Sequence, residues 1–193
     1  WTIDGISLTQ NDYLEWGYKR GFYLGSDPEH HWIYARKDNW STGESEDWIL
    51  EWNRSTRVIT GEALGNVSSY RAPCDFDGDG DLDIVYIENG DLKWRKQLGP
   101  GLIGGPLPIS TGINAQDLVT IRNAPLIAYR QDGNLIIRGL DQPPVELGKG
   151  RPYDGIYTSG KYHLYYEQDG IGHQIELSDS LTVTKTNLIE APY

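Results

Sequence analysis

One short pattern recurs along this chain and constrains its fold more than any other feature. An apolar run containing a tyrosine is followed by an Asn-Gly or Asp-Gly pair and then by a second alternating run. Such a pair accepts the positive φ angles of a two-residue turn, so each copy predicts a β-hairpin. The matching tyrosines are Tyr86, Tyr129 and Tyr166, and a looser copy with a longer connection contains Tyr34.

The spacing of the four hairpins indicates how they are organised. Successive tyrosines lie 52, 43 and 37 residues apart, which is the length of a four-stranded propeller blade. Short apolar runs flank the hairpins and can serve as inner strands (21–24, 118–121, 155–157) or outer strands (57–60, 145–147). The expected fold is therefore all-β: a small four-bladed β-propeller formed by residues 1–193 as one domain. A β-sandwich uses the same hairpins and is the alternative.

Three further expectations concern the rest of the chain. Residues 2–8 and 181–184 alternate like strands but have no blade of their own, so we expect them to pair and close the ring. Gly and Pro fill seven of the ten positions from 99 to 108, which predicts a loop between blades or, alternatively, a domain boundary. In the looser hairpin, Leu50 and Trp52 are expected at the places of Leu92 and Trp94.

Composition and charge exclude several classes of protein. A net charge of -11 with scattered basic residues disfavours nucleic acid as a partner and favours cations. No apolar run is long enough to insert into a membrane. The single cysteine, Cys74, has no internal disulfide partner and is expected to be a small buried residue. The lack of methionine, even at position 1, indicates a processed chain or the excised, distal part of a larger surface protein.

Carboxylates alternate between residues 75 and 83, where the sequence predicts a metal site. They lie at positions 1, 3, 5, 7 and 9 of the segment, with Gly80 at position 6: Asp75, Asp77, Asp79, Asp81 and Asp83. Calcium takes about six to eight hard oxygens, and glycine permits the sharp turn that gathers them. We expect Ca2+ to be bound by four of the side chains and, by analogy with EF-hand position 7, by the backbone carbonyl of Asp81. A solvated turn is the alternative.

The loop does not fit an EF-hand. An EF-hand needs an acidic ligand at position 12 and a helix on each side, but position 12 here is Tyr86 in an apolar, strand-like run. Residues 72–86, Ala-Pro-Cys-Asp-Phe-Asp-Gly-Asp-Gly-Asp-Leu-Asp-Ile-Val-Tyr, instead resemble the FG-GAP or VCBS repeat of integrin-like β-propellers. That resemblance implies a propeller in which this loop joins two strands of a blade and holds calcium. It also implies an adhesive or ligand-binding role.

Exposed aromatic side chains are the usual platform for sugars, and this chain is rich in tryptophan and tyrosine. Trp40 lies in the polar connection of the first hairpin and is the best candidate for a ligand contact, followed by Trp16, Tyr18 and Tyr153. His30 and His31 are adjacent, so in a strand they point to opposite faces and do not suit one transition-metal ion. A solvated turn is expected there.

The sequence contains no recognisable catalytic motif, so we expect a binding protein rather than an enzyme. The predicted function is an extracellular, calcium-stabilised module that recognises a glycan or a cell-surface receptor, as an adhesin or a viral or phage spike head does. A propeller-type carbohydrate-active enzyme, a glycoside hydrolase or lyase using paired carboxylates, is the main alternative. A structural assembly domain is the third.

Overall fold

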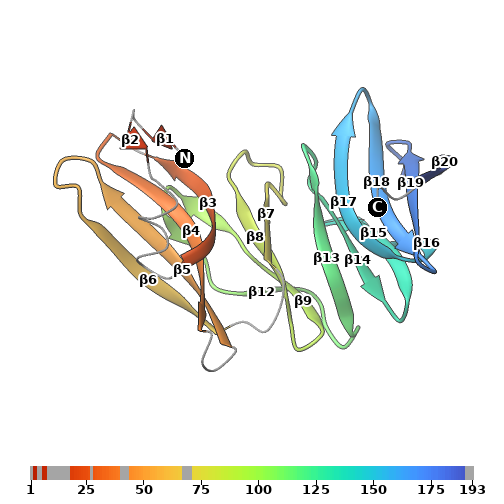
Figure 1. Ribbon diagram of the computed structural model, residues 1–193, viewed down its shortest axis with the longest axis horizontal. Coiled ribbons are helices and arrows are strands. Elements are labelled where there is room, and N and C mark those ends of the chain that lie inside the picture. Colours follow the sequence, from red (N-terminus) through yellow and green to blue (C-terminus); the bar gives the residue numbers. More distant parts are fainter. Residues whose placement is uncertain are drawn as a thin grey trace. The chain divides into compact units, whose positions relative to one another are not determined.

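The computed structural model describes residues 2–3, 6–7, 18–26, 28–39, 44–66 and 71–189, and every regular element among them is a β-strand (Figure 1). The all-β prediction is confirmed. Contacts divide the chain into two compact units, Trp1–Ser68 with Leu98–Leu102, and Ser69–Gln97 with Ile103–Tyr193. The described part of the chain contains no helix with the length and hydropathy of a membrane span.

The first unit contains one antiparallel sheet of four strands taken in sequence order. They are β3 (Tyr18–Ser26), β4 (His30–Asn39), β5 (Glu44–Asn53) and β6 (Ile59–Asn66). Two short strands, β1 (Thr2–Ile3) and β2 (Ile6–Ser7), pair with each other. Alternation along β4 and β5 places Ile33, Ala35 and Leu50 together in a small core.

The second unit begins with another antiparallel sheet of four strands, in the order β12-β9-β8-β7. Its strands are β7 (Arg71–Cys74), β8 (Asp83–Glu88), β9 (Asp91–Arg95) and β12 (Leu107–Ser110). The Gly- and Pro-rich segment contributes β10 (Gln97–Gly99) and β11 (Leu102–Ile103), which pair with each other. Along the chain this segment joins the third and fourth strands of that sheet, but its own strands form a separate two-stranded sheet, and Leu98–Leu102 are grouped with the first unit. It therefore does not join one four-stranded sheet to the next, as the predicted loop between blades would.

The remaining strands form an eight-stranded sheet made of two antiparallel meanders. The first meander contains β13 (Ala115–Arg122), β14 (Leu126–Gln131), β15 (Asn134–Gly139) and β16 (Val145–Lys149). The second contains β17 (Arg151–Thr158), β18 (Lys161–Gln168), β19 (Ile171–Leu177) and β20 (Val183–Ile189). The first strand of each meander joins the other in a short parallel pair, in which Ile121 lies opposite Gly155 and Arg122 opposite Ile156.

The predicted hairpin turns explain why successive strands pair in sequence order. At each turn an Asn or Asp with φ of 50° to 54° precedes a glycine with φ of 79° to 85°. Both central residues therefore adopt the left-handed conformation of a type I′ turn, which glycine and asparagine tolerate and β-branched residues do not. The pairs are Asn89-Gly90, Asp132-Gly133 and Asp169-Gly170. The three tight hairpins are confirmed.

Two apolar cores hold the second unit together. The first packs β8 and β9 against β13 to β15 and buries Phe76, Val85, Leu92, Trp94 and Tyr129. The second packs side chains of β14 and β15 against Leu164, Ile175 and Leu177 of the last meander. Since its two halves share this core, the eight-stranded sheet folds over at the β13–β17 pair toward a nearly closed, barrel-like arrangement.

Two expectations about strand positions are wrong. In the tight hairpin that contains it, Leu92 pairs with the residue that follows the repeat tyrosine. In the first hairpin, the residue that follows the repeat tyrosine pairs with Trp48 instead. Leu50 therefore occupies the place of Trp94, because sequence distance from the turn cannot be counted through a longer connection. Residues 183–189 form β20, the outer strand of the last meander, so the C-terminal strand is not a surplus one.

Candidate metal centre

The aspartate segment is the connection between β7 and β8. Cys74 and Asp83 are paired partners at its base, so the backbone must reverse direction between them. Gly78 and Gly80 have φ angles of 79° and 97°, which an L side chain rarely adopts. The two glycines therefore permit the tight path that turns the aspartate side chains inward.

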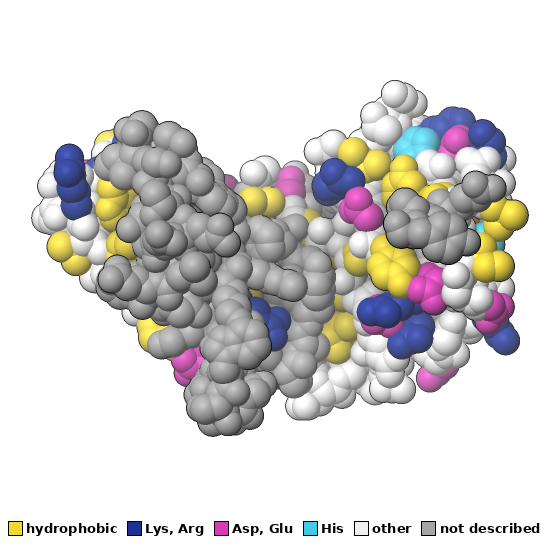
Figure 2. Space-filling view, in the orientation of Figure 1, with side chains coloured by type: hydrophobic (Ala, Val, Ile, Leu, Met, Phe, Trp, Pro, Cys, Tyr) yellow, Lys and Arg dark blue, Asp and Glu magenta, His cyan; other side chains and the backbone are white. Residues whose placement is uncertain are grey.

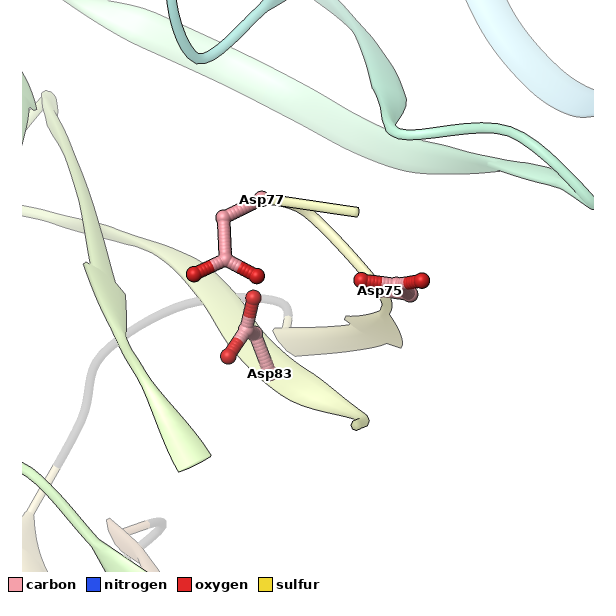
Figure 3. Close-up of side chains that lie close together, drawn as sticks. All are labelled: Asp75, Asp77 and Asp83. Carbon is pink, nitrogen blue, oxygen red and sulfur yellow. The ribbon is translucent and has the colours of Figure 1, made fainter. Parts of the chain in front are cut away.

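Three of the five aspartates come together. Carboxylate oxygens of Asp75, Asp77 and Asp83 all lie within 4.8 Å of one another, and Figure 3 shows the carboxylates of Asp77 and Asp83 facing each other. Asp83 is fully buried, while the other two are partly buried. Three carboxylates at this separation repel one another strongly unless a cation or a proton is present. This group could hold a metal ion.

Asp83 anchors the group to the backbone. Its two carboxylate oxygens accept hydrogen bonds from the backbone N–H groups of Phe76 at 3.1 Å and Gln97 at 2.9 Å. Burial, reinforced by the charge of Asp77, raises the pKa of Asp83 to about 6 despite these hydrogen bonds. One buried side chain thus ties the start of the loop to the segment after β9.

Asp75 supplies the clearest sign that a cation fits. Its Oδ2 accepts a hydrogen bond of 3.1 Å from the N–H of Gly80. Its Oδ1 is buried and has no hydrogen-bond partner in the described structure. An ionised oxygen without a partner is costly to bury, and a cation bound there would remove that cost.

Asp79 and Asp81 lie outside this group. The side chain of Asp79 instead forms an ion pair of 2.9 Å with Lys96, whose ammonium also contacts Asp77. This contact lowers the pKa of the Asp79 carboxyl below its ordinary value. The backbone N–H of Asp81 donates to Asp79 at 3.0 Å. Sequence reasoning missed Lys96, since nothing in its spacing signals that it reaches across to the loop.

Of the other predicted site residues, the structure describes one side chain. Trp16 and Trp40 lie outside the described residues, and Tyr18 begins β3 with a side chain that is also outside them. Tyr153 in β17 is 52% exposed. Its hydroxyl donates to Glu167, and the guanidinium of Arg151 lies 5.4 Å from its ring centre. Of the four candidates, Tyr153 is the one whose exposure the structure describes.

The adjacent histidines are not in a solvated turn, contrary to expectation. They begin strand β4, where His31 is buried and stacks on Trp52 with ring centres 5.2 Å apart. His30 contacts Asn53 at 3.1 Å and Glu51 at 3.5 Å. The pair therefore belongs to the packing of the first sheet.

Cys74 is buried beside the aspartate group, as expected. Burial, together with the charges of Asp83 and Asp75, raises the pKa of its thiol above the ordinary value. The thiol is therefore neutral at physiological pH and unsuited to nucleophilic chemistry.

Charges of both signs are mixed on the surface of the second unit. In Figure 2, Lys and Arg side chains lie beside Asp and Glu side chains on the described face of this unit. Ion pairs account for part of this mixing, including Arg122 with Asp154 at 2.7 Å and Arg130 with Asp117 at 2.8 Å.

Comparisons with known proteins show limited similarity. No protein-family model and no curated protein matches the sequence. A solved prolyl endopeptidase structure, from a study of inter-domain dynamics in catalysis and specificity, matches 89% of this chain with a TM-score of 0.47 and 9% identity. The matched region spans 27% of that chain.

Proposed function

We propose that this chain is a calcium-stabilised, four-bladed β-propeller that serves as an extracellular binding module. The observation that carries the proposal is the Asp75, Asp77 and Asp83 group, with its buried, unpartnered oxygen. The propeller is supported by four antiparallel meanders that follow one another along the chain, since each has the four strands of one blade. The calcium loop would then connect the first two strands of the second blade.

Calcium suits this donor set better than other common ions. The group offers carboxylate oxygens, which hard cations prefer, and the neighbouring Cys74 is a buried neutral thiol. Magnesium demands a small, nearly regular octahedron, whereas calcium accepts the irregular oxygen sets of flexible loops. The ion would neutralise the repulsion among the three aspartates and fix the loop between β7 and β8. Its role in this proposal is structural.

The affinity for calcium should fall as the pH is lowered through about 6. A proton must leave Asp83 before the ion binds, and its pKa is raised to about 6. Below that pH the affinity should fall by up to about tenfold per pH unit. Calcium titrations at pH 7 and pH 5 measure this loss, and equal affinities at the two values would contradict it.

The folding stability of the metal-free protein should fall, whereas its affinity for calcium rises, as the pH increases. An unfolded aspartate has a pKa of about 3.9. Since the folded protein holds the Asp83 proton more tightly, the stability of the metal-free form should decrease as the pH rises from about 4 to about 6. Urea unfolding in the presence of a chelator measures this trend.

Replacing Lys96 by glutamine should strengthen calcium binding. The ammonium of Lys96 contacts Asp77 and Asp79 and so competes with the ion for the same negative charge. Removing it should raise the affinity roughly two- to fivefold, as expected for a solvent-screened charge. Lys93→Gln is the matched control, because Lys93 pairs with Glu88 instead. Weaker calcium binding in Lys96→Gln would show that the lysine supports the site.

We propose that the ligand of this binding module is a glycan of a cell surface. The ring of Tyr153 is half exposed and held by Arg151 and Glu167, so it offers a flat, oriented face to a sugar. A glycan panel probed with the calcium-loaded protein tests this role. Tyr153→Ala should lose the signal, whereas Ile171→Ala, at an equally exposed apolar residue, should keep it. Calcium-loaded protein that binds no glycan, or a Tyr153→Ala variant that binds normally, would contradict the proposal.

A further inference from the structure

A cavity of about 510 Å³ adjoins the metal centre within the second unit. One wall consists of Cys74, Asp75 and Leu82, at the two ends of the aspartate loop. The other wall is the segment 120–125, where β13 ends and turns into β14. Small-molecule sites occupy roughly 300–1,000 Å³, so this cavity has the volume of a site for a small ligand.

Both walls are held in place by the fold. Ile121 is buried in the second core and lies opposite Gly155 in the parallel strand pair. The turn after it is closed by a hydrogen bond of 3.2 Å from the N–H of Ala124 to the carbonyl of Ile121. Across the cavity, Cys74 is buried and paired with Asp83. The cavity is therefore lined by the ends of β7 and β13 and by the loop and turn residues next to them.

Asp75 belongs both to the metal centre and to the cavity wall. Its Oδ1 is buried and unpartnered, and its other oxygen is engaged by Gly80. Three carboxylates do not complete the six to eight oxygen ligands that calcium takes. An ion bound to Asp75 therefore has coordination positions left for an oxygen of a ligand in the cavity.

Arg122 gives the opposite wall a positive charge. One guanidinium nitrogen donates to Asp154 at 2.7 Å, while the side chain remains 59% exposed. A guanidinium carries five N–H donors, so further donors remain for a carboxylate of the ligand. Thr120 and Asn123 add a hydroxyl and an amide to the same wall. Leu82, Ala124 and Pro125 supply apolar surface.

We propose that this cavity binds a carboxylated monosaccharide, such as a hexuronic acid, in a calcium-dependent manner. The carboxylate lies between Arg122 and the ion, the sugar hydroxyls contact Thr120 and Asn123, and the C–H face of the ring packs on the apolar residues. A neutral hexose lacks the group that both positive centres recognise. This inference rests on the calcium site proposed above and adds a ligand to it.

Calorimetric titration of galacturonate into the calcium-loaded protein tests the inference, after calcium binding has been measured in each variant. Galactose controls for the sugar ring, and acetate controls for the carboxylate alone. Arg122→Gln removes the proposed contact. Arg130→Gln is the matched control, because Arg130 also forms an ion pair with an aspartate, Asp117, and lies outside the cavity lining.

Galacturonate should bind equally well to the calcium-loaded wild type and to Arg130→Gln. It should bind at least tenfold more weakly to Arg122→Gln, and not at all in chelator. Galactose and acetate should bind at least tenfold more weakly than galacturonate. Protein that binds calcium but not galacturonate overturns the cavity proposal alone. Equal binding of galactose or acetate, or unchanged binding by Arg122→Gln, overturns it as well. Protein that binds no calcium overturns the metal centre, and the cavity proposal with it.

Discussion

Asp83→Ala should lower the free energy of unfolding by about 2–5 kcal/mol even when no calcium is present. The substitution removes the acceptor of two backbone N–H groups, those of Phe76 and Gln97, around a fully buried position. Both backbone N–H groups then lose this acceptor, and a small cavity remains. Urea unfolding in chelator measures this loss separately from any loss of metal binding.

Asp79→Ala is the matched control for Asp83→Ala. Asp79 belongs to the same loop, but its side chain is exposed and pairs with Lys96 rather than with a buried backbone group. Its replacement should change stability far less than that of Asp83. Equal losses in the two variants would show that Asp83 is not the anchor of the loop.

Leu164→Ala should lower the free energy of unfolding by about 2–5 kcal/mol. Leu164 is fully buried in β18 and belongs to the core shared by the two halves of the eight-stranded sheet. Removing most of its side chain leaves a cavity that the flanking strands cannot fill without distorting the β13–β17 junction. Denaturant unfolding monitored by tryptophan fluorescence and by circular dichroism gives the change.

Leu188→Ala is the control for this core prediction, since Leu188 lies in β20 and is 72% exposed. Its replacement should change the free energy of unfolding by no more than about 0.5 kcal/mol. If both leucines behave alike, the two meanders do not share the core described here.

The hairpin turns and the aspartate group could be predicted from the sequence because neighbouring residues determine them. Each Asn-Gly or Asp-Gly pair specifies its own turn, so the hairpins at residues 89–90, 132–133 and 169–170 could be predicted without knowledge of the rest of the fold. Alternate spacing likewise brings Asp75, Asp77 and Asp83 together, because the loop that carries them is closed by one strand pair.

Contacts between distant segments could not be predicted in the same way. The register of the first hairpin depends on a connection of unknown path, so Trp48 was missed at the position equivalent to Leu92. Lys96 reaches the aspartate loop only because the pairing of β8 with β9 brings it there. The cavity next to Asp75 depends on residues 120–125, which are about 45 positions away in the sequence. None of these contacts has a local sequence signal.

Direct titration of the metal-free protein with calcium tests the central claim, because it measures binding at the Asp75, Asp77 and Asp83 group itself. The wild type should bind calcium, and Asp75→Asn/Asp77→Asn should lose at least about tenfold in affinity, since two charged ligands become neutral. Asp132→Asn, at an aspartate of a hairpin turn, should bind as the wild type does. An absence of binding at millimolar calcium, or equal affinity in the wild type and Asp75→Asn/Asp77→Asn, would contradict the account.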